Sequence, residues 1–338
     1  MKKLFVLMIS MFFVLGLFTG CDEDSPTKSE APPTATALFV LNSSATSISV
    51  VDLETGTVYN DAATVGTWPN QIVYNGGKLY CVNSGSNNIM VFNPDTWAIE
   101  TISLGPNNNP MNMAFYDENT AYVACSVSNK VLQVDLTAKT VTKTIDAGVG
   151  ATGIAIADGK VYVANTAFDG SNYTYGQGTV TVVDAATGNF IKTLNVATNP
   201  QAVGVTSDGM INVVCTGDYF SQFGKIAIIN PATNTVVDSI DVGNSPGSIS
   251  ISHSDDMAYL GIWGAGILSY NTGTKVIENG SDNLLLGKGG SGVVTDTEGN
   301  IFVSVWEDDQ VVKIDSDGNV LATYNVGDSP LSLTIKVE

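Results

Sequence analysis

Short apolar segments alternate with polar, glycine-rich segments from residue 37 to the end of the chain, and the alternation repeats. Three markers recur together. The first is a proline, replaced twice by Ala or Gly, just before an apolar segment. The second is a short segment centred on an aromatic residue, as in Leu79-Tyr80-Cys81, and the third is an Asp or Asn that closes an alternating segment. Segments of this length and pattern predict β-strands, and none has sustained helical periodicity.

The markers return about every 40 to 50 residues, which is the period of four-stranded propeller blades. The first and third markers stand at Pro69, Pro110, Ala151, Pro200, Pro246, Gly290 and Pro330, and at Asp52, Asn93, Asp135, Asp184, Asn230, Asn271 and Asp315. The aromatic marker is missing once, in Ile211-Asn212-Val213. Each repeat divides into an apolar strand A, an aromatic strand B, an alternating strand C and a strand D that follows a hairpin turn such as Asp317-Gly318.

The two ends of the repeat region complement each other. The first repeat begins with its strand B at Leu38, whereas the chain ends with an unpaired strand A at residues 329–337. We expect this last strand to complete the first blade, because closing the ring removes two open sheet edges. The sequence therefore predicts an all-β fold, a seven-bladed β-propeller with four antiparallel strands per blade, over residues 37–338.

The N-terminus has the organisation of a secretory signal. Lys2 and Lys3 precede an apolar run over residues 4–18, which is short for a membrane span of roughly 20 residues. The following Leu17-Phe18-Thr19-Gly20-Cys21 resembles the lipobox of bacterial lipoproteins. The resemblance implies a signal peptide at residues 1–20 and a lipidated Cys21; an uncleaved anchor helix is the alternative. Residues 21–36 are polar and proline-rich, so we expect a disordered tether.

The destination of the anchored protein follows from the residues after Cys21. The acidic run Asp22-Glu23-Asp24 resembles the export signal of surface-exposed Bacteroidetes lipoproteins. In enterobacteria, an aspartate at this position resembles an inner-membrane retention signal instead. We expect an exported protein anchored in the outer membrane at the cell surface, with the periplasmic face of the inner membrane as the alternative.

Charge and histidine content exclude several functions. The formal net charge is −19, and all 14 basic side chains are lysines. Nucleic-acid binding requires a basic surface, and bidentate recognition of phosphate or carboxylate usually relies on arginine, so neither is expected. His253 is the only histidine and falls in a turn between strands A and B. A histidine-based triad or multi-histidine metal site is therefore excluded, and no cofactor is predicted.

Three cysteines remain after lipidation. Cys81, Cys125 and Cys215 all fall in apolar strands, and the repeat alignment places Cys125 and Cys215 in non-adjacent blades. A disulfide requires close Cα atoms, so we expect buried, inert thiols.

The repeats resemble the YVTN family of propellers, which includes YncE-like proteins. The similarity lies in Val161-Tyr162-Val163-Ala164-Asn165 followed by Val180-Thr181-Val182-Val183-Asp184, close to the family pattern Y-V-x-N … V-x-V-I-D. It implies the propeller fold but not a function, because family members bind different ligands. The strand-B asparagine of the family stands at Asn42, Asn83 and Asn165, where we expect it to cap the following loop.

Aromatic residues gather in loops on one face of the predicted ring. The D–A and B–C connections emerge on this face, which we call the top, and the A–B and C–D turns emerge on the bottom. The B–C loops of blades 4 and 5 are the longest, over residues 166–178 and 216–224. The candidate ligand-binding residues are Trp68, Phe168, Tyr173, Tyr175, Tyr219, Phe220, Phe223, Trp263 and Trp306. As alternatives, the long loops bury their own rings, or the tryptophans plug the channel.

Binding of a small solute, glycan or cofactor on this face is the first function that the sequence predicts. A lipid-anchored propeller is also the architecture of the vitamin B12-capturing surface lipoproteins of Bacteroidetes, which it resembles in this respect. The alternative is a cell-surface adhesion or scaffold protein that binds a partner protein. A metal-dependent hydrolase or lactonase rests on fold analogy alone, with Glu307, Asp308 and Asp309 as weak candidates for a Ca²⁺ site. No catalytic constellation is visible, so we predict a protein that is not an enzyme.

Overall fold

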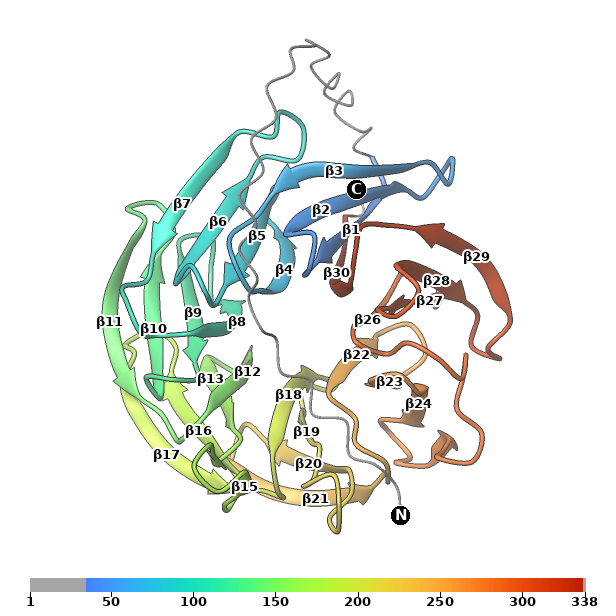
Figure 1. The fold of residues 1–338 in the computed structure, drawn as a ribbon. Coiled ribbons are helices and arrows are strands. Elements are labelled where there is room, and N and C mark those ends of the chain that lie inside the picture. Colours follow the sequence, from blue (N-terminus) through green and yellow to red (C-terminus); the bar gives the residue numbers. More distant parts are fainter. Residues whose placement is uncertain (1–34, 337–338) are drawn as a thin grey trace. The chain divides into compact units, whose positions relative to one another are not determined.

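The predicted seven-bladed β-propeller is confirmed. A computed structural model describes residues 35–336, and these form seven four-stranded antiparallel sheets arranged in a ring, without helices (Figure 1). Among these residues no helix is long and apolar enough to span a membrane. The predicted lipid-attachment residue Cys21, the signal peptide and most of the tether lie outside the described residues.

Each blade runs from an inner strand at the channel to an outer strand at the rim. Blade 1 contains β30 (Pro330–Lys336), β1 (Ala37–Asn42), β2 (Ser47–Asp52) and β3 (Val58–Thr64); blade 2 contains β4 (Pro69–Asn75), β5 (Lys78–Asn83), β6 (Asn88–Phe92) and β7 (Ile99–Ser103); and blade 3 contains β8 (Pro110–Phe115), β9 (Thr120–Cys125), β10 (Lys130–Asp135) and β11 (Thr140–Asp146). Blade 4 contains β12 (Ala151–Ala157), β13 (Lys160–Asn165), β16 (Thr179–Asp184) and β17 (Phe190–Asn195), with a separate hairpin of β14 (Phe168–Asp169) and β15 (Thr174–Tyr175). Blade 5 contains β18 (Pro200–Val205), β19 (Ile211–Cys215), β20 (Lys225–Asn230) and β21 (Thr235–Asp241); blade 6 contains β22 (Ser248–Ser252), β23 (Met257–Ile262), β24 (Gly266–Asn271) and β25 (Ile277–Asn279); and blade 7 contains β26 (Val293–Thr295), β27 (Ile301–Val305), β28 (Gln310–Ile314) and β29 (Val320–Asn325).

The C-terminal strand closes the ring as predicted. β30 pairs antiparallel with β1, and Leu333 lies opposite Val40 in the register. The side chains of β30 also accept hydrogen bonds from blade 2, because Ser332 Oγ lies 3.2 Å from the backbone nitrogen of Ile72. The first blade therefore consists of segments from both ends of the described chain.

The Asx marker organises the turn between strands C and D. The Asp52 side chain accepts hydrogen bonds from the backbone N–H groups of Glu54 and Thr55, at 2.9 and 3.1 Å. The side chain of Asn271 accepts equivalent bonds from Gly273 and Thr274. Short carboxyl or amide side chains satisfy turn N–H groups in this way, which explains why all seven blades carry Asp or Asn here.

In blades 3 and 4 the aromatic residue of strand B also connects its blade to the next one through a hydroxyl group. Tyr122 donates to the backbone oxygen of Ala185 in blade 4 at 2.9 Å, and Tyr162 donates to Asn234 in blade 5 at 2.7 Å. Burial raises the pKa of both tyrosines to about 12, so the hydroxyls stay protonated. Where blade 5 lacks the aromatic residue, Asn212 instead accepts a hydrogen bond of 2.8 Å from Tyr270 of blade 6.

A central channel of about 400 Å³ is lined by the inner strands of all seven blades. Neighbouring inner strands are joined by side-chain bonds to backbone, for example from Asn70 to Pro110 O at 3.2 Å and from Thr152 to Gln201 O at 2.9 Å. They also approach closely, because a side chain at Gly153 would lie 2.4 Å from Gln201 O. The inner ring is thus rigid, and it carries uncharged polar groups toward the top of the channel.

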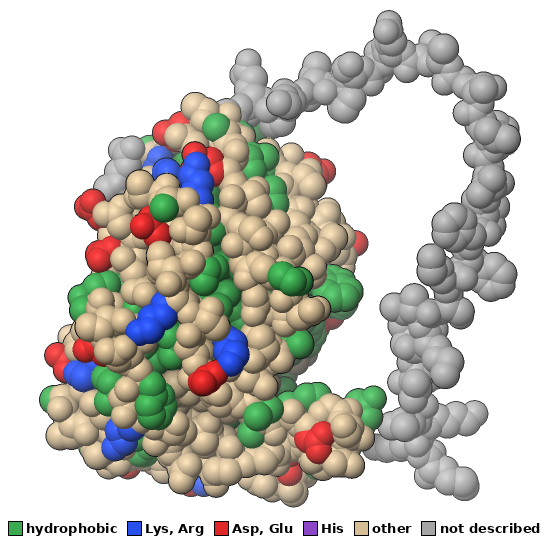
Figure 2. Space-filling view, turned by 90° about the vertical axis from the view of Figure 1, so that its left-hand side faces the viewer, with side chains coloured by type: hydrophobic (Ala, Val, Ile, Leu, Met, Phe, Trp, Pro, Cys, Tyr) green, Lys and Arg blue, Asp and Glu red, His purple; other side chains and the backbone are tan. Residues whose placement is uncertain are grey.

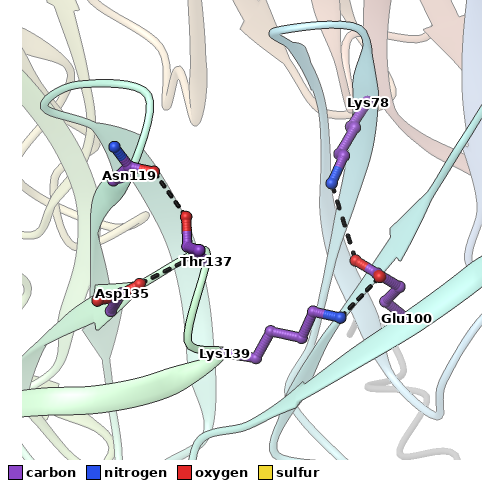
Figure 3. A network of polar contacts seen from close by, with 6 residues as sticks. All are labelled: Lys78, Glu100, Asn119, Asp135, Thr137 and Lys139. Carbon is purple, nitrogen blue, oxygen red and sulfur yellow. Dashed lines mark hydrogen bonds and ion pairs between the residues drawn. The ribbon is translucent and has the colours of Figure 1, made fainter.

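Bottom-face turns of neighbouring blades are held together by polar contacts (Figure 3). Glu100 of blade 2 lies 2.6 Å from Lys139 of blade 3 and 3.8 Å from Lys78. Lys139 is the main reason that the pKa of Glu100 is lowered. Within blade 3, Thr137 of the C–D turn donates to Asn119 of the A–B turn at 2.6 Å. In the view that faces the outer side bearing β7 and β11, charged side chains and hydrophobic side chains are scattered over a surface made mostly of other side chains and backbone (Figure 2).

The cysteines agree with the sequence-based prediction, whereas one connection between blades does not follow from the repeat. Cys81, Cys125 and Cys215 are free and buried, as expected for inert thiols. The D–A connection between blades 6 and 7 was not foreseen: it is long, and Leu285 inserts into the core and bridges to Ile267 of β24. The consecutive leucines at 284–286 are the signal that could have indicated this packing.

Candidate functional site

The D–A and B–C loops share the top face, as the repeat alignment predicts. In blade 4, Thr166 of the B–C loop donates from its backbone nitrogen to Gly150 O of the D–A loop at 3.1 Å. Ser84 and Trp68 form the same contact in blade 2 at 2.9 Å. The B–C loop of blade 4 folds into the β14–β15 hairpin, with Tyr173 close to its tip.

Four rings of blades 4 and 5 form a continuous row, which we call the aromatic row. Its members, in spatial order, are Tyr173, Phe168, Tyr175 and Tyr219, with successive ring centroids 6.4, 5.1 and 6.3 Å apart. Successive ring planes are inclined by 67°, 46° and 53°. The Tyr219 hydroxyl accepts a hydrogen bond of 3.1 Å from Gln201, which lines the channel. The aromatic row therefore leads from the β14–β15 hairpin to the channel mouth.

The row contains both exposed and sheltered rings. Tyr173 is 81% exposed and Tyr219 is 51% exposed, whereas Phe168 is 39% exposed and Tyr175 is half-buried between its neighbours. Burial and the nearby Tyr219 hydroxyl raise the pKa of Tyr175, so its phenol remains neutral. The two long loops thus shelter part of their aromatic surface and present the rest to solvent.

Asp218 shapes the B–C loop of blade 5. Its carboxylate accepts backbone hydrogen bonds from Phe220, Ser221 and Gln222 at 2.9, 2.7 and 2.8 Å, and one from the Ser221 hydroxyl at 2.6 Å. These bonds, that from Gln222 foremost, hold the pKa of Asp218 well below its usual range. The ionised Asp218 carboxylate therefore stabilises the conformation of its own loop.

Close backbone packing fixes both long loops. Gly217 has φ +86°, and a Cβ there would lie 2.0 Å from Gln222 O. A Cβ on Gly178 would lie equally close to Ala197 O. Asn199 donates to Gly217 O at 3.0 Å, and Gln177 donates to Val196 O at 2.6 Å. The loops are consequently preorganised, which lowers the entropy cost of binding.

A cavity of about 570 Å³ adjoins the B–C loop of blade 5, near the outer end of that blade. Phe223 supplies an aromatic ring that is 56% exposed, and Thr198 and Gln222 supply polar groups joined by a 2.5 Å hydrogen bond. Lys225 and Asp241 also line the cavity and form an ion pair of 2.5 Å. We call this space the Phe223 cavity.

The remaining aromatic candidates form separate groups. Trp263 and Trp306 lie together, with ring centroids 5.5 Å apart. Phe220 is 87% exposed, and no ring contact joins it to the aromatic row. Trp68 and Trp263 are exposed, and none of the candidate tryptophans lines the central channel. The structure therefore joins four of the nine predicted residues into one row.

Trp68 occupies an unusual backbone position. Its φ is +50°, in the left-handed region that disfavours bulky side chains. The corresponding positions before Pro110, Pro200 and Pro330 also have positive φ and hold Asn109, Asn199 and Ser329. Because Asn and Ser fill the same backbone role elsewhere, the fold alone does not require tryptophan here.

The three acidic residues considered as metal ligands have different partners. Asp308 pairs with Lys288 at 2.6 Å, and Asp309 accepts a hydrogen bond of 2.9 Å from the backbone nitrogen of Ser329. Glu307 lies close to Gly264 of blade 6. Within residues 35–336, no three His, Cys, Asp or Glu side chains are grouped so that they could hold a metal ion.

Sequence reasoning missed the polar residues between the rings. Thr198 lies in the D–A connection and Gln201 lies in the inner strand of blade 5. The sequence shows only a Pro-x-x motif there. These residues come close to the candidate site only because separate segments of the chain pack together. Thr198 and Gln222, for example, form a hydrogen bond although they are 24 residues apart. The proline marker at Pro200 was the available signal, because it places the next residue at the channel mouth.

Comparison with known proteins places the fold but not the function. No protein-family model matches the sequence, and no curated protein matches it. A functionally unknown protein from Desulfotomaculum acetoxidans is 15% identical, with a TM-score of 0.68 over 89% of this chain and 99% of that chain. A quinoprotein alcohol dehydrogenase-like protein from Bacteroides thetaiotaomicron is 16% identical, with a TM-score of 0.66 over 88% and 77%. Hydrazine synthase of Kuenenia stuttgartiensis is 16% identical, with a TM-score of 0.65 over 82% and 92%.

Proposed function

We propose that this chain is an exported, lipid-anchored protein of the YVTN type whose propeller binds a ligand on the top face. Binding, rather than catalysis, is the function that we assign to the B–C loops of blades 4 and 5. The observation that carries the proposal is the aromatic row. Four contacting rings stand in preorganised loops beside the channel mouth, and two of them are more than half exposed. Exposed rings in fixed positions offer large contact areas at low entropy cost.

Backbone strain supports the same proposal. Trp68, Tyr173 and Tyr219 have φ values of +50°, +54° and +66°, and all three side chains are exposed. An exposed aromatic residue in this conformation costs of order 1–3 kcal/mol without a compensating core contact. Retaining such residues is consistent with a role in recognition.

The test replaces exposed rings and leaves the sheets intact. A variant with Tyr173→Ser, Tyr219→Ser and Phe220→Ser should unfold at nearly the wild-type temperature and lose its ligand. The measurement is the shift in melting temperature of the detergent-solubilised protein on addition of a small-molecule extract of the host cells. Tyr116→Ser is the matched control, because Tyr116 is an exposed aromatic residue of a bottom turn. An extract that stabilises the triple variant as much as the wild type would refute the proposed site.

A second variant removes strain as well as a ring. Trp68→Asn introduces the residue type found at positions 109 and 199, so stability should be unchanged or slightly higher. If Trp68 contacts the ligand, the extract should stabilise this variant less than the wild type. Capture of a protein instead of a small molecule by the wild-type top face would favour the adhesion alternative.

The lipid anchor has its own test. Cys21→Ser should abolish acylation and release the protein from the membrane fraction, because the acyl chains on Cys21 are the proposed anchor, whereas an uncleaved anchor helix would hold the variant in the membrane. The measurement is the distribution of the protein between membrane and soluble fractions, together with the mass of its N-terminal peptide. A Cys21→Ser protein that remains in the membrane fraction would contradict the lipoprotein assignment.

A further inference from the structure

The geometry of the aromatic row selects among ligand classes. Each ring contacts only the next one, in the order Tyr173, Phe168, Tyr175 and Tyr219. An aromatic cage for a quaternary ammonium requires rings that surround one point, each within about 6 Å of the cation. In the aromatic row the rings contact one another in succession, and no contact joins Tyr173 at one end to Tyr219 at the other. The arrangement therefore favours an extended ligand over a compact cation.

The inclination of the rings argues against a flat aromatic ligand. Successive planes differ by at least 46°, so no single planar molecule can stack on two neighbouring rings of the row at once. A chain of ring-shaped units joined by rotatable bonds can turn each unit to meet a differently tilted face. An oligosaccharide has this construction, and each sugar ring has an apolar C–H face that can stack on an aromatic ring.

The charges around the row favour an uncharged ligand. The chain contains no arginine, and its net charge of −19 repels anions. The carboxylates of Asp218 and Asp169 accept hydrogen bonds from their own loops, and Lys225 forms an ion pair with Asp241. The two long loops, over residues 166–178 and 216–224, contain no lysine or arginine that could neutralise a sugar acid or a phosphate.

The polar groups beside the rings match hydroxyl groups. Amide and hydroxyl side chains both donate and accept hydrogen bonds, as sugar hydroxyls do. Gln201 and the Tyr219 hydroxyl lie at the inner end of the row, whereas Thr198 and Gln222 line the Phe223 cavity. Both groups come from the same segments of blade 5, because Thr198 is three residues before Gln201 and Gln222 is three residues after Tyr219.

We propose that the top face binds a neutral oligosaccharide, with successive sugar rings on the aromatic row and a further sugar unit in the Phe223 cavity. This inference rests on the binding function proposed above and assigns its ligand class. The row supplies stacking faces, and Gln201, Thr198 and Gln222 bond to sugar hydroxyls.

The experiment titrates the detergent-solubilised full chain with neutral hexasaccharides and with an acidic counterpart. The neutral probes are cellohexaose, xylohexaose, mannohexaose, maltohexaose and chitohexaose, and the acidic probe is hexagalacturonate. We expect at least one neutral probe to bind, measured by calorimetry, with saturation transfer from the protein strongest at sugar C–H protons. Tyr219→Ser and Phe223→Ser should each weaken its binding by about tenfold, the loss of one stacking contact. Tyr219→Phe should weaken it less, because the ring remains, and Tyr116→Ser should have no effect.

Each other outcome overturns the carbohydrate inference. Failure of all five neutral probes to bind, tighter binding of hexagalacturonate, or binding that the Tyr219 and Phe223 variants leave unchanged would each do so. The host-extract experiment separates this failure from that of the proposed function. If the extract stabilises the wild type but not the triple variant while no hexasaccharide binds, the top face has a ligand of another class. If neither has an effect, both proposals fail.

Discussion

The two faces of the propeller are built from the same repeat but use it differently. Bottom turns are short and are stabilised by hydrogen bonds within the turn. The Asp315 side chain, for example, accepts hydrogen bonds from the backbone N–H groups of Asp317 and Asn319. Their charged groups pair between blades, as Glu100 does with Lys139 (Figure 3). Top loops vary in length, and in blades 4 and 5 they carry exposed rings.

The difference shows which positions the fold constrains. A bottom turn only has to reverse the chain, so a few residue types that suit tight turns recur in every blade. The top loops have the same task, yet those of blades 4 and 5 are longer than chain reversal requires and hold Tyr and Phe in solvent. Loops positioned by a rigid scaffold are where binding residues concentrate. The proposed binding site therefore rests on loop features that the fold itself does not require.

Removing the closing strand should have the largest effect, and it should destroy both faces together. Deletion of residues 329–338 leaves β1 with an open edge and removes the contact of β30 with blade 2. We expect loss of most of the unfolding free energy, which for a domain is roughly 5–15 kcal/mol. Denaturant unfolding measures the change, and deletion of residues 337–338 alone is the control. A truncated protein as stable as the wild type would contradict ring closure.

A pair of glycines in blade 5 should distinguish the faces at intermediate cost. Gly217 on the top and Gly209 on the bottom have φ +86° and +80°, but only Gly217 lacks room for a Cβ. Gly209→Ala should cost about 1–2 kcal/mol from conformation alone. Gly217→Ala should cost about 3 kcal/mol, because overpacking adds to the same strain. Thermal unfolding of the two variants measures the difference, and equal costs would show that the top loop yields freely.

Acid titration should produce the smallest difference between the faces. Hydrogen bonds to Asp218 and Asp315 hold the pKa of each below its usual value. A lowered folded-state pKa adds stability above the unfolded-state value of about 4, and this stability is lost as the pH falls below it. Asp218→Asn and Asp315→Asn should therefore be less stable than the wild type at pH 7, and each gap should narrow below about pH 4. Only Asp218→Asn should also weaken binding of the extract ligand. A gap that does not depend on pH would show that the carboxylate charge contributes nothing.

Much of the fold could be predicted because the same strand and turn pattern recurs in all seven blades. The Asx marker and the aromatic residue of strand B each have a local physical role. Where blade 5 lacks the aromatic residue, a hydrogen bond from Tyr270 to Asn212 takes its place. The candidate site was predictable only as a list of aromatic residues on the right face. The Phe223 cavity and the bond between Gln201 and Tyr219 arise where separate loops meet, and no local pattern encodes such meetings.

The sequence by itself determined the number of blades, the strand that closes the ring and the face on which each loop emerges. These follow from the alternation within each strand and from the repeat of the same pattern along the chain, both of which can be read without coordinates. Only the tertiary structure decided that Tyr173, Phe168, Tyr175 and Tyr219 form one row while Trp263 and Trp306 stand apart. The distance between two rings depends on how loops from different blades pack, and that packing is a property of the closed ring.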